Sequence, residues 1–184
     1  MGRKKNFSRE SVLDKTIQVF WESGYADTTL QDLELATGVN KSGLYSEFTD
    51  KEDLYLASLT HYLSGVQKQD WLTAEPLGWS NIERFLKLGC AGTPEQKGCF
   101  CVSAIREVAV LPEQAKQIIS EAQSWLRQHI LNNLNAIETR IAADGLAEVI
   151  LIFYFGICID QNNATTPEAT AQKIECFMQM LRSS

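Results

Sequence analysis

The chain has 184 residues, of which 45% are hydrophobic and 22% are charged, a composition that suits a buried core and excludes a disordered protein. Its net charge of −6 at pH 7 and sequence pI of about 5.0 argue against indiscriminate binding to nucleic acid. Alternation of β-branched and polar residues is almost absent, so we expect an all-α fold.

The first ten residues form a basic arm, with Arg3, Lys4, Lys5 and Arg9 against Glu10 alone. Such an arm can contact phosphates although the whole chain is acidic. It contains no apolar stretch of the kind found in secretory signals, and the most apolar run, residues 149–159, is too short to span a bilayer. We therefore expect a cytoplasmic protein without membrane contact.

The first predicted helix begins after Ser8, a suitable N-cap residue. Leu13, Ile17 and Phe20 then recur at the spacing of one buried helix face. Gly24 is expected to close this helix, because glycine adopts the backbone conformation that ends helices.

Two short helices follow. Thr29-x-x-Asp32 predicts a capping box at the start of a helix over residues 30–36. Gly38 suits a tight turn, and Asn40 is the predicted N-cap of a third helix. A long helix followed by two short ones with a glycine turn between them is typical of a helix-turn-helix.

The third helix has one apolar and one polar face. Val39, Leu44 and Phe48 would pack inward. The residues expected to face outward are Asn40, Lys41, Ser42, Gly43 and Tyr45. A small polar face of this kind can enter the DNA major groove, although a helical hairpin with a solvated face is the alternative on spacing alone. A capping box of Thr49 and Glu52 then predicts a fourth helix over residues 50–66.

Residues 24–55, GYADTTLQDLELATGVNKSGLYSEFTDKEDLY, closely resemble the DNA-binding region of TetR-family transcriptional regulators. In that family a Gly-aromatic pair ends the first helix, a Thr-Thr/Ser pair starts the second, and Thr/Ala-Gly-Val forms the turn. A Leu-Tyr-x-x-Phe run ends the third helix and a Lys-Glu pair starts the fourth. The matching groups here are Gly24-Tyr25, Thr28-Thr29, Thr37-Gly38-Val39, Leu44-Tyr45-x-x-Phe48 and Lys51-Glu52.

The resemblance implies contacts to DNA from individual residues. It implies phosphate contacts from Thr28, Thr29, Tyr45 and Lys51, base-edge contacts from Lys41, Ser42 and Gly43, and capping or a phosphate contact by Asn40. Where the family often has His or Tyr, this chain has Glu47, whose carboxylate cannot bind a phosphate favourably. We expect that backbone contact to be missing.

The resemblance also implies an organisation in two domains. Residues 1–49 would form the helix-turn-helix DNA-binding domain, and residues 50–184 a helical effector-binding and dimerisation domain. The implied protein is a ligand-responsive repressor that binds a palindromic operator as a homodimer. A small hydrophobic or aromatic effector would release it from double-stranded DNA.

Further helices are predicted over residues 80–91, 98–110, 112–142, 146–160 and 168–181. The helix over residues 146–160 is apolar nearly all round, and the last helix carries a second apolar stripe. We expect these two helices to form a four-helix dimer interface that includes Phe155 and Phe177, with an intramolecular core as the alternative.

The family architecture implies an apolar effector pocket with a few polar anchors. The residues expected to line it are Phe85, Leu88, Cys99, Phe100, Ser103, Trp125, His129, Tyr154 and Cys158, each of which could instead be ordinary core.

The five cysteines are odd in number and include no C-x-x-C pair, which favours free thiols in a reducing compartment. Cys99 lies near a predicted helix N-terminus, where its pKa can fall, so a thiol-based redox- or electrophile-sensing regulator is an alternative. Cys101 would point elsewhere on a regular helix, and no disulfide between the two is expected.

Enzymes and interaction modules are the rival classes. The sequence contains no H-E-x-x-H, G-x-S-x-G, P-loop or dinucleotide-binding motif, and its two histidines lie far apart. The scattered cysteines suggest no zinc site, so we expect neither metal nor cofactor. A helical enzyme or a protein-interaction module would leave the residues from Thr28 to Lys51 unexplained.

Overall fold

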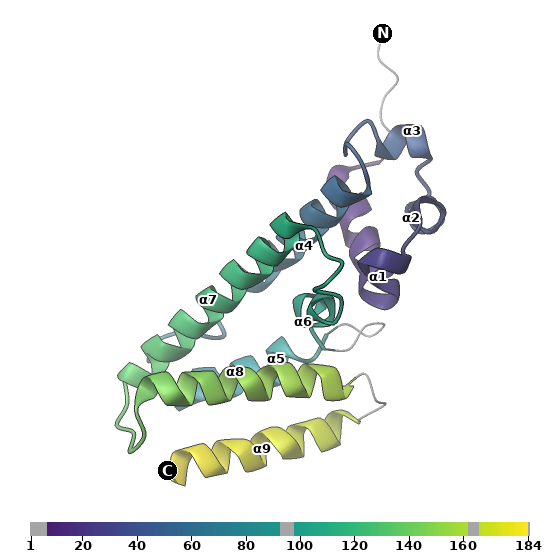
Figure 1. The fold of residues 1–184 in the computed structure, drawn as a ribbon. Helices are drawn as coiled ribbons and strands as arrows, with labels where there is room; N and C mark the ends of the chain where they lie inside the picture. Colours follow the sequence, from purple (N-terminus) through teal and green to yellow (C-terminus); the bar gives the residue numbers. More distant parts are fainter. Residues whose placement is uncertain (1–6, 93–97, 162–165, 184) are drawn as a thin grey trace.

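The computed structural model describes residues 7–92, 98–161 and 166–183. Within these ranges the chain forms nine helices and no strand, so the all-α prediction is confirmed (Figure 1). No helix in the described ranges is long and apolar enough to cross a membrane. The basic residues Arg3, Lys4 and Lys5 lie outside the described residues.

Three helices at one end of the molecule form the expected N-terminal unit: α1 (Arg9–Asp27), α2 (Leu30–Thr37) and α3 (Lys41–Leu44) (Figure 1). Ser8 caps α1 as predicted, because its hydroxyl accepts a hydrogen bond from the Ser11 N–H at 3.1 Å. Gly24 interrupts α1 with φ 83° and ψ 170°, and the chain adds one more helical turn before it ends.

Helix α4 (Lys51–Gln67) begins with a different cap from the one predicted. Asp50 is the N-cap residue, and its carboxylate accepts from the Asp53 N–H at 2.9 Å. The Asp53 carboxylate in turn accepts from the Thr49 N–H at 2.8 Å, so the predicted pair of Thr49 and Glu52 is wrong by one residue. Aspartate is the better N-cap of the two neighbours, which explains the shift.

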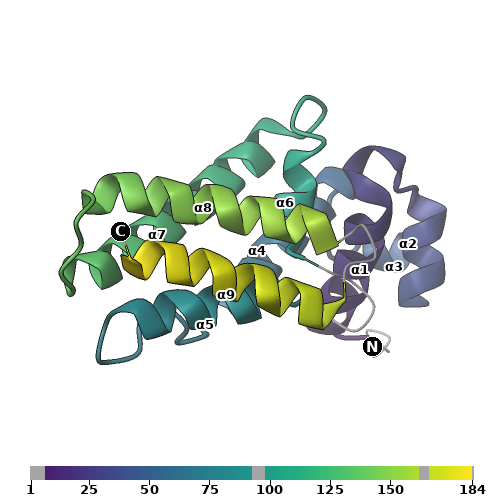
Figure 2. The same cartoon turned by 90° about the horizontal axis from the view of Figure 1, so that it is seen from below.

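The remaining helices are α5 (Trp79–Gly89), α6 (Phe100–Ile105), α7 (Glu113–Asn135), α8 (Ala143–Asp160) and α9 (Pro167–Ser183). The long helices α4 and α7 run side by side (Figure 1). Helices α8 and α9 run side by side at the end of the molecule far from α3 (Figures 1 and 2), and the rings of Phe153 and Phe177 stack between them at 3.8 Å.

Two predicted helices are shorter than expected. The helix over 98–110 is reduced to α6, and tight turns carry the chain on to Leu111, whose place before Pro112 disfavours helix. The helix over 112–142 stops at Asn135. Near its end, the buried amide of Asn133 accepts from the Gly78 N–H at 2.9 Å and donates to the Leu72 carbonyl at 2.8 Å, which holds the segment before α5 against α7.

An aromatic cluster joins the N-terminal unit to the rest of the core. The ring of Phe100 on α6 lies 5.9 Å from Trp21 on α1, 6.1 Å from Tyr55 and 5.7 Å from Tyr62 on α4, measured between ring centroids. These contacts join residues on both sides of the expected domain boundary at residue 49, so the hydrophobic core is continuous across that boundary. That division stays a prediction.

Candidate nucleic-acid interface and internal cavity

The start of α2 is held by the predicted capping box. The Thr29 hydroxyl accepts from the Asp32 N–H at 3.3 Å, and the Asp32 carboxylate accepts from the Thr29 N–H at 2.8 Å and from its hydroxyl at 2.6 Å. These bonds lower the pKa of Asp32. At the other end, Gly38 adopts the left-handed conformation that the turn requires, with φ 71°.

Helix α3 is four residues long and is held by its surroundings. Asn40 caps it through its side-chain oxygen, which accepts from the Gly43 N–H at 2.9 Å, and the Glu34 carboxylate accepts from the Lys41 N–H. The residues expected to pack inward, Val39, Leu44 and Phe48, are all buried.

The polar face of α3 is exposed as predicted. Asn40, Lys41, Ser42 and Tyr45 are exposed, and the Lys41 ammonium lies 5.7 Å from the centre of the Tyr45 ring. Gly43 is partly buried, and a Cβ there would lie 2.6 Å from a methyl carbon of Val39. Glycine at this position is therefore required by packing, whatever it contacts outside the protein.

Three of the expected phosphate-binding residues are engaged within the protein: Thr29 in the capping box described above, and Thr28 and Lys51 at the end of α1. Thr28 is 1% exposed, and its hydroxyl donates to the Gly24 carbonyl at 2.6 Å. The Lys51 ammonium donates to the carbonyls of Tyr25 at 2.8 Å and Thr28 at 3.0 Å, and it lies 4.6 Å from the Tyr25 ring centre. The structure thus brings Thr29, Tyr45 and the α3 face to the surface, but not the Thr28 hydroxyl.

Arg9 also belongs to this surface, although it was not among the individual residues expected to contact DNA. Its guanidinium donates to the Glu47 carbonyl at 3.0 Å and lies 4.3 Å from the Phe48 ring centre. This holds the start of α1 against the end of the α3 turn. The position of Arg9 in the basic arm was the only hint in the sequence that it lies on this surface. Its hydrogen bond to Glu47 joins residues far apart in the chain and could not be predicted from spacing.

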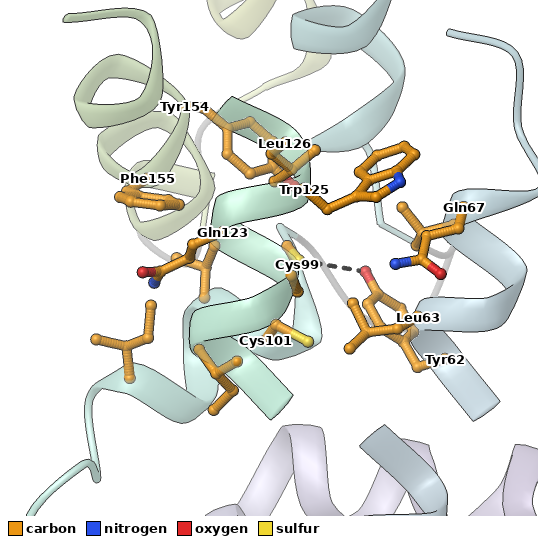
Figure 3. A pocket seen from close by; sticks show the side chains of 15 residues that line it. Tyr62, Leu63, Gln67, Cys99, Cys101, Gln123, Trp125, Leu126, Tyr154 and Phe155 are labelled. Carbon is orange, nitrogen blue, oxygen red and sulfur yellow. Dashed lines mark hydrogen bonds between the residues drawn. The ribbon is translucent and has the colours of Figure 1, made fainter. Parts of the chain in front are cut away.

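An apolar cavity lies between α4, α6, α7 and α8 (Figure 3). Its volume is about 30 Å³, room for one or two water molecules. It is lined by Tyr62, Leu63, Val66, Gln67, Cys99, Cys101, Val102, Ile105, Ile119, Ala122, Gln123, Trp125, Leu126, Tyr154 and Phe155. The α4 residues of this lining were not among the nine expected pocket residues, although Tyr62, Leu63 and Val66 share one helical face.

Three of the nine expected pocket residues line this cavity: Cys99, Trp125 and Tyr154. The other six lie elsewhere for identifiable reasons. Phe100 belongs to the aromatic cluster, and Phe85 packs behind Tyr154 with ring centres 4.6 Å apart.

The remaining four are spread over other parts of the molecule. Leu88 is 47% exposed, Cys158 is buried outside the lining, and Ser103 faces a polar hollow beside Gly24. The ring of His129 is hydrogen-bonded through Nδ1 to the Trp125 carbonyl at 2.8 Å.

Cys99 has an unusual environment for a buried thiol. The Tyr62 hydroxyl donates to its sulfur at 3.4 Å (Figure 3). Hydrogen bonds from Cys101 and Tyr62 lower the pKa of Cys99 to about 6, against the opposing effect of burial. The pKa of Cys101 is raised because it donates to Cys99 and is itself buried, and burial raises that of Cys90 to about 11. In the described ranges no group of three or more His, Cys, Asp or Glu could hold a metal ion.

Known proteins are similar to this chain in the sequence of the N-terminal unit and in the whole fold. Residues 12–58 match the model of the bacterial regulatory proteins of the tetR family. The HTH-type transcriptional repressor ComR of Escherichia coli is 48% identical over 62 residues, which span 34% of this chain and only 30% of ComR. YezE of Bacillus subtilis, an uncharacterized HTH-type transcriptional regulator, is 30% identical over 159 residues, covering 78% of this chain and 81% of YezE.

Among solved structures, a cysteine mutant of the TetR family transcriptional regulator CifR, complexed with a 26-base-pair operator DNA, superposes with a TM-score of 0.83. The match covers 96% of this chain and 98% of CifR at 22% sequence identity. The reduced form of E. coli NemR superposes with a TM-score of 0.79 at 17% identity, covering 94% of this chain and 95% of NemR. At these identities the likeness concerns the fold.

Two lysines that were both expected to contact DNA should differ in their effect on the stability of the fold. Lys51→Ala removes charge-assisted bonds to carbonyls at the end of α1, and it should lower the free energy of unfolding by on the order of 1–3 kcal/mol. Lys41→Ala on the exposed face should change it by less than about 0.5 kcal/mol. Urea denaturation measures both. Equal stabilities of the two variants would show that water satisfies those carbonyls equally well.

Proposed function

This chain belongs to the TetR family of bacterial regulatory proteins, and we propose that it is a cytoplasmic repressor that binds a palindromic operator as a homodimer and leaves it when a small apolar effector occupies the cavity. As a member of this family it is a DNA-binding transcriptional regulator rather than an enzyme.

The observation that carries the proposal is the exposed polar face of α3 on a buried apolar frame. Lys41 can donate to guanine O6 or N7 in the major groove, and Ser42 can donate or accept. Tyr45 is exposed and suits a contact to a phosphate, whereas the exposed Thr29 would have to release Asp32 before its hydroxyl could donate to one. Thr28 and Lys51 would support these contacts by holding the end of α1. Either residue would have to give up its hydrogen bonds to backbone carbonyls before it could bind a phosphate itself.

Dimerisation is supported by apolar side chains on the outer faces of α8 and α9. Ile152 is 69% exposed and Met180 is 63% exposed, with Val149 and Ile159 also exposed on α8. The proposed interface uses these residues instead of Phe155 and Phe177. Phe177 is buried against Phe153, and Phe155 lines the cavity, so a charge at either would disturb the fold of the monomer.

The small volume of the cavity favours an effector whose binding changes the conformation of the protein. Ligand pockets usually measure roughly 300–1,000 Å³, so a cavity of about 30 Å³ must open before an effector fits. An effector that binds only the opened form shifts the population toward it. Tyr62 and Leu63 lie at the cavity end of α4, and Lys51 lies at its other end, next to α1. A tilt of α4 would change the spacing of the two recognition helices, which has to match about 34–36 Å.

A second candidate is a regulator that senses electrophiles through Cys99. The low pKa of this thiol and its place in the cavity lining favour it. A thiolate at Cys99 would add to the carbon–carbon double bond of an electrophile, forming a C–S bond while the adjacent carbon takes a proton from water.

The reading of bases is tested with Lys41→Ala. An operator is first selected from a random DNA pool with the parent protein. The variant should then lose preference at one base position of each half-site, at a cost of roughly 1–3 kcal/mol per half-site, because one donor to a base edge is missing. Anisotropy titrations on the operator and on random duplex measure this. An equal loss on both would make Lys41 a phosphate contact.

The interface is tested with Ile152→Glu. A carboxylate at this exposed position should leave the monomer folded but should be buried unpaired in the dimer, so sedimentation should show monomers. Leu35→Glu is the matched control, because Leu35 is 85% exposed on α2, away from α8 and α9. An unchanged dimer for Ile152→Glu would place the interface elsewhere.

The thiol candidate is tested by alkylation with N-ethylmaleimide in a Cys176→Ser background, which removes the exposed cysteine. With a pKa of about 6, Cys99 should be largely thiolate at pH 7, and its rate of alkylation should fall as the pH drops through about 6. Intact mass spectrometry follows one added label. The same labelling in a Cys99→Ser variant, or operator binding unaffected by the label, would remove this candidate.

A further inference from the structure

The turn that ends α1 is held by a residue from a distant part of the chain. After the break at Gly24, Tyr25 and Ala26 begin a new helical turn, and the first N–H groups of a helical turn need acceptors from outside it. Both donate to the carboxylate of Glu107, at 3.2 Å to Oε1 and 3.0 Å to Oε2. Glu107 lies in the turns that follow α6.

The fit between Glu107 and the break is close. A Cβ at Gly24 would lie 2.0 Å from Oε1 of Glu107, so the carboxylate occupies the space that any side chain at position 24 would need. The positive φ of Gly24 adds a second reason for glycine there. Each carboxylate oxygen accepts one backbone N–H, which is a well-defined two-point contact.

On its other side the same turn is held by Lys51, through the carbonyls of Tyr25 and Thr28. The turn between Gly24 and Thr28 is therefore positioned by one acid and one base from two different elements. Thr29, the next residue, is the N-cap of α2. A displacement of this turn must move α2, and α3 with it.

Glu107 is also close in sequence to the cavity. Cys99, Cys101, Val102 and Ile105 line the cavity from α6 and its N-cap, and Glu107 follows Ile105 by two residues. Just before α6 the chain lies close against α8 at Gly98, where a Cβ would lie 2.5 Å from the Cys158 carbonyl oxygen. An occupant that widens the cavity therefore presses on a six-residue helix whose far end holds the turn of α1.

We propose that Glu107 is the positioning residue that couples the cavity to the DNA-binding surface. Widening of the cavity shifts α6, withdraws the Glu107 carboxylate from Tyr25 and Ala26, and releases the orientation of α2 and α3 for DNA. This rests on the proposed function, because it assumes that occupation of the cavity weakens operator binding. The contact supplies the differential interaction between the two states that such coupling requires.

A double-mutant cycle tests the coupling without a known effector. Ala122→Leu adds more side-chain volume than the cavity offers and stands for an occupant, and Ala122→Val is the smaller substitute if the first does not fold. In the parent background it should weaken operator binding by roughly 5–150-fold, the usual range of allosteric coupling. In a Glu107→Gln background one of the two accepting oxygens becomes an NH2 group, which cannot accept an N–H, so the same substitution should weaken binding less than about threefold.

Arg106→Gln is the matched control, because Arg106 is exposed in the same turn and should leave the full effect of Ala122→Leu in place. Amide hydrogen exchange gives a readout that a purely structural role for Glu107 would not move. Ala122→Leu alone should accelerate exchange at Tyr25 and Ala26.

The outcomes separate this inference from the proposed function. If Ala122→Leu weakens operator binding equally in the parent and Glu107→Gln backgrounds, the cavity regulates DNA binding by another route and the role of Glu107 is overturned. If folded Ala122→Leu changes neither operator binding nor exchange at Tyr25 and Ala26, the inference and the effector role of the cavity both fall, while DNA binding by α3 stands.

Discussion

The structure depends on how the chain satisfies the backbone where α1 breaks at Gly24. A helix end leaves N–H and C=O groups without partners inside the helix. Here Glu107 accepts from the N–H groups and Lys51 donates to the carbonyls. Because α2 begins at once after this turn, two side chains that belong to other elements help to orient α2.

The aromatic cluster around Phe100 packs the N-terminal unit directly against the helices that line the cavity. Its rings connect α1, α4 and α6, and one of them, Tyr62, also lines the cavity. Close-packed interiors deform little without repacking, so a change at the cavity wall has to be taken up by neighbouring helices. The small cavity and the tight cluster together favour two discrete arrangements over a gradual one.

Local features were predictable from sequence because their partners lie within a few residues. Ser8, the pair of Thr29 and Asp32, Gly38 and Asn40 all form the caps or turns that their chemistry predicts. The cap of α4 was misplaced by one residue because Thr49 and Asp50 are both acceptable caps, and the stronger preference of aspartate for the N-cap position decides between them.

Long-range contacts could not be predicted in the same way. The amide of Asn133 meets Gly78, 55 residues away, and Glu107 meets Tyr25, 82 residues away, so no spacing rule indicates either contact. The cavity lining was only partly predicted for the same reason: a helical pattern shows that Phe85 and Cys158 are buried, but not which helix covers them.

In α3 the residues that hold the helix in place differ from those exposed to a partner, and this has an evolutionary consequence. Val39, Leu44 and Phe48 hold the helix from inside, so codons for Lys41 and Ser42 can mutate with little effect on folding, since exposed substitutions usually change stability by about 0.5 kcal/mol or less. Position 43 is closed to such drift, because any Cβ there collides with Val39. Gene duplicates of this protein could therefore diverge toward new operators through two neighbouring codons while inheriting the same scaffold.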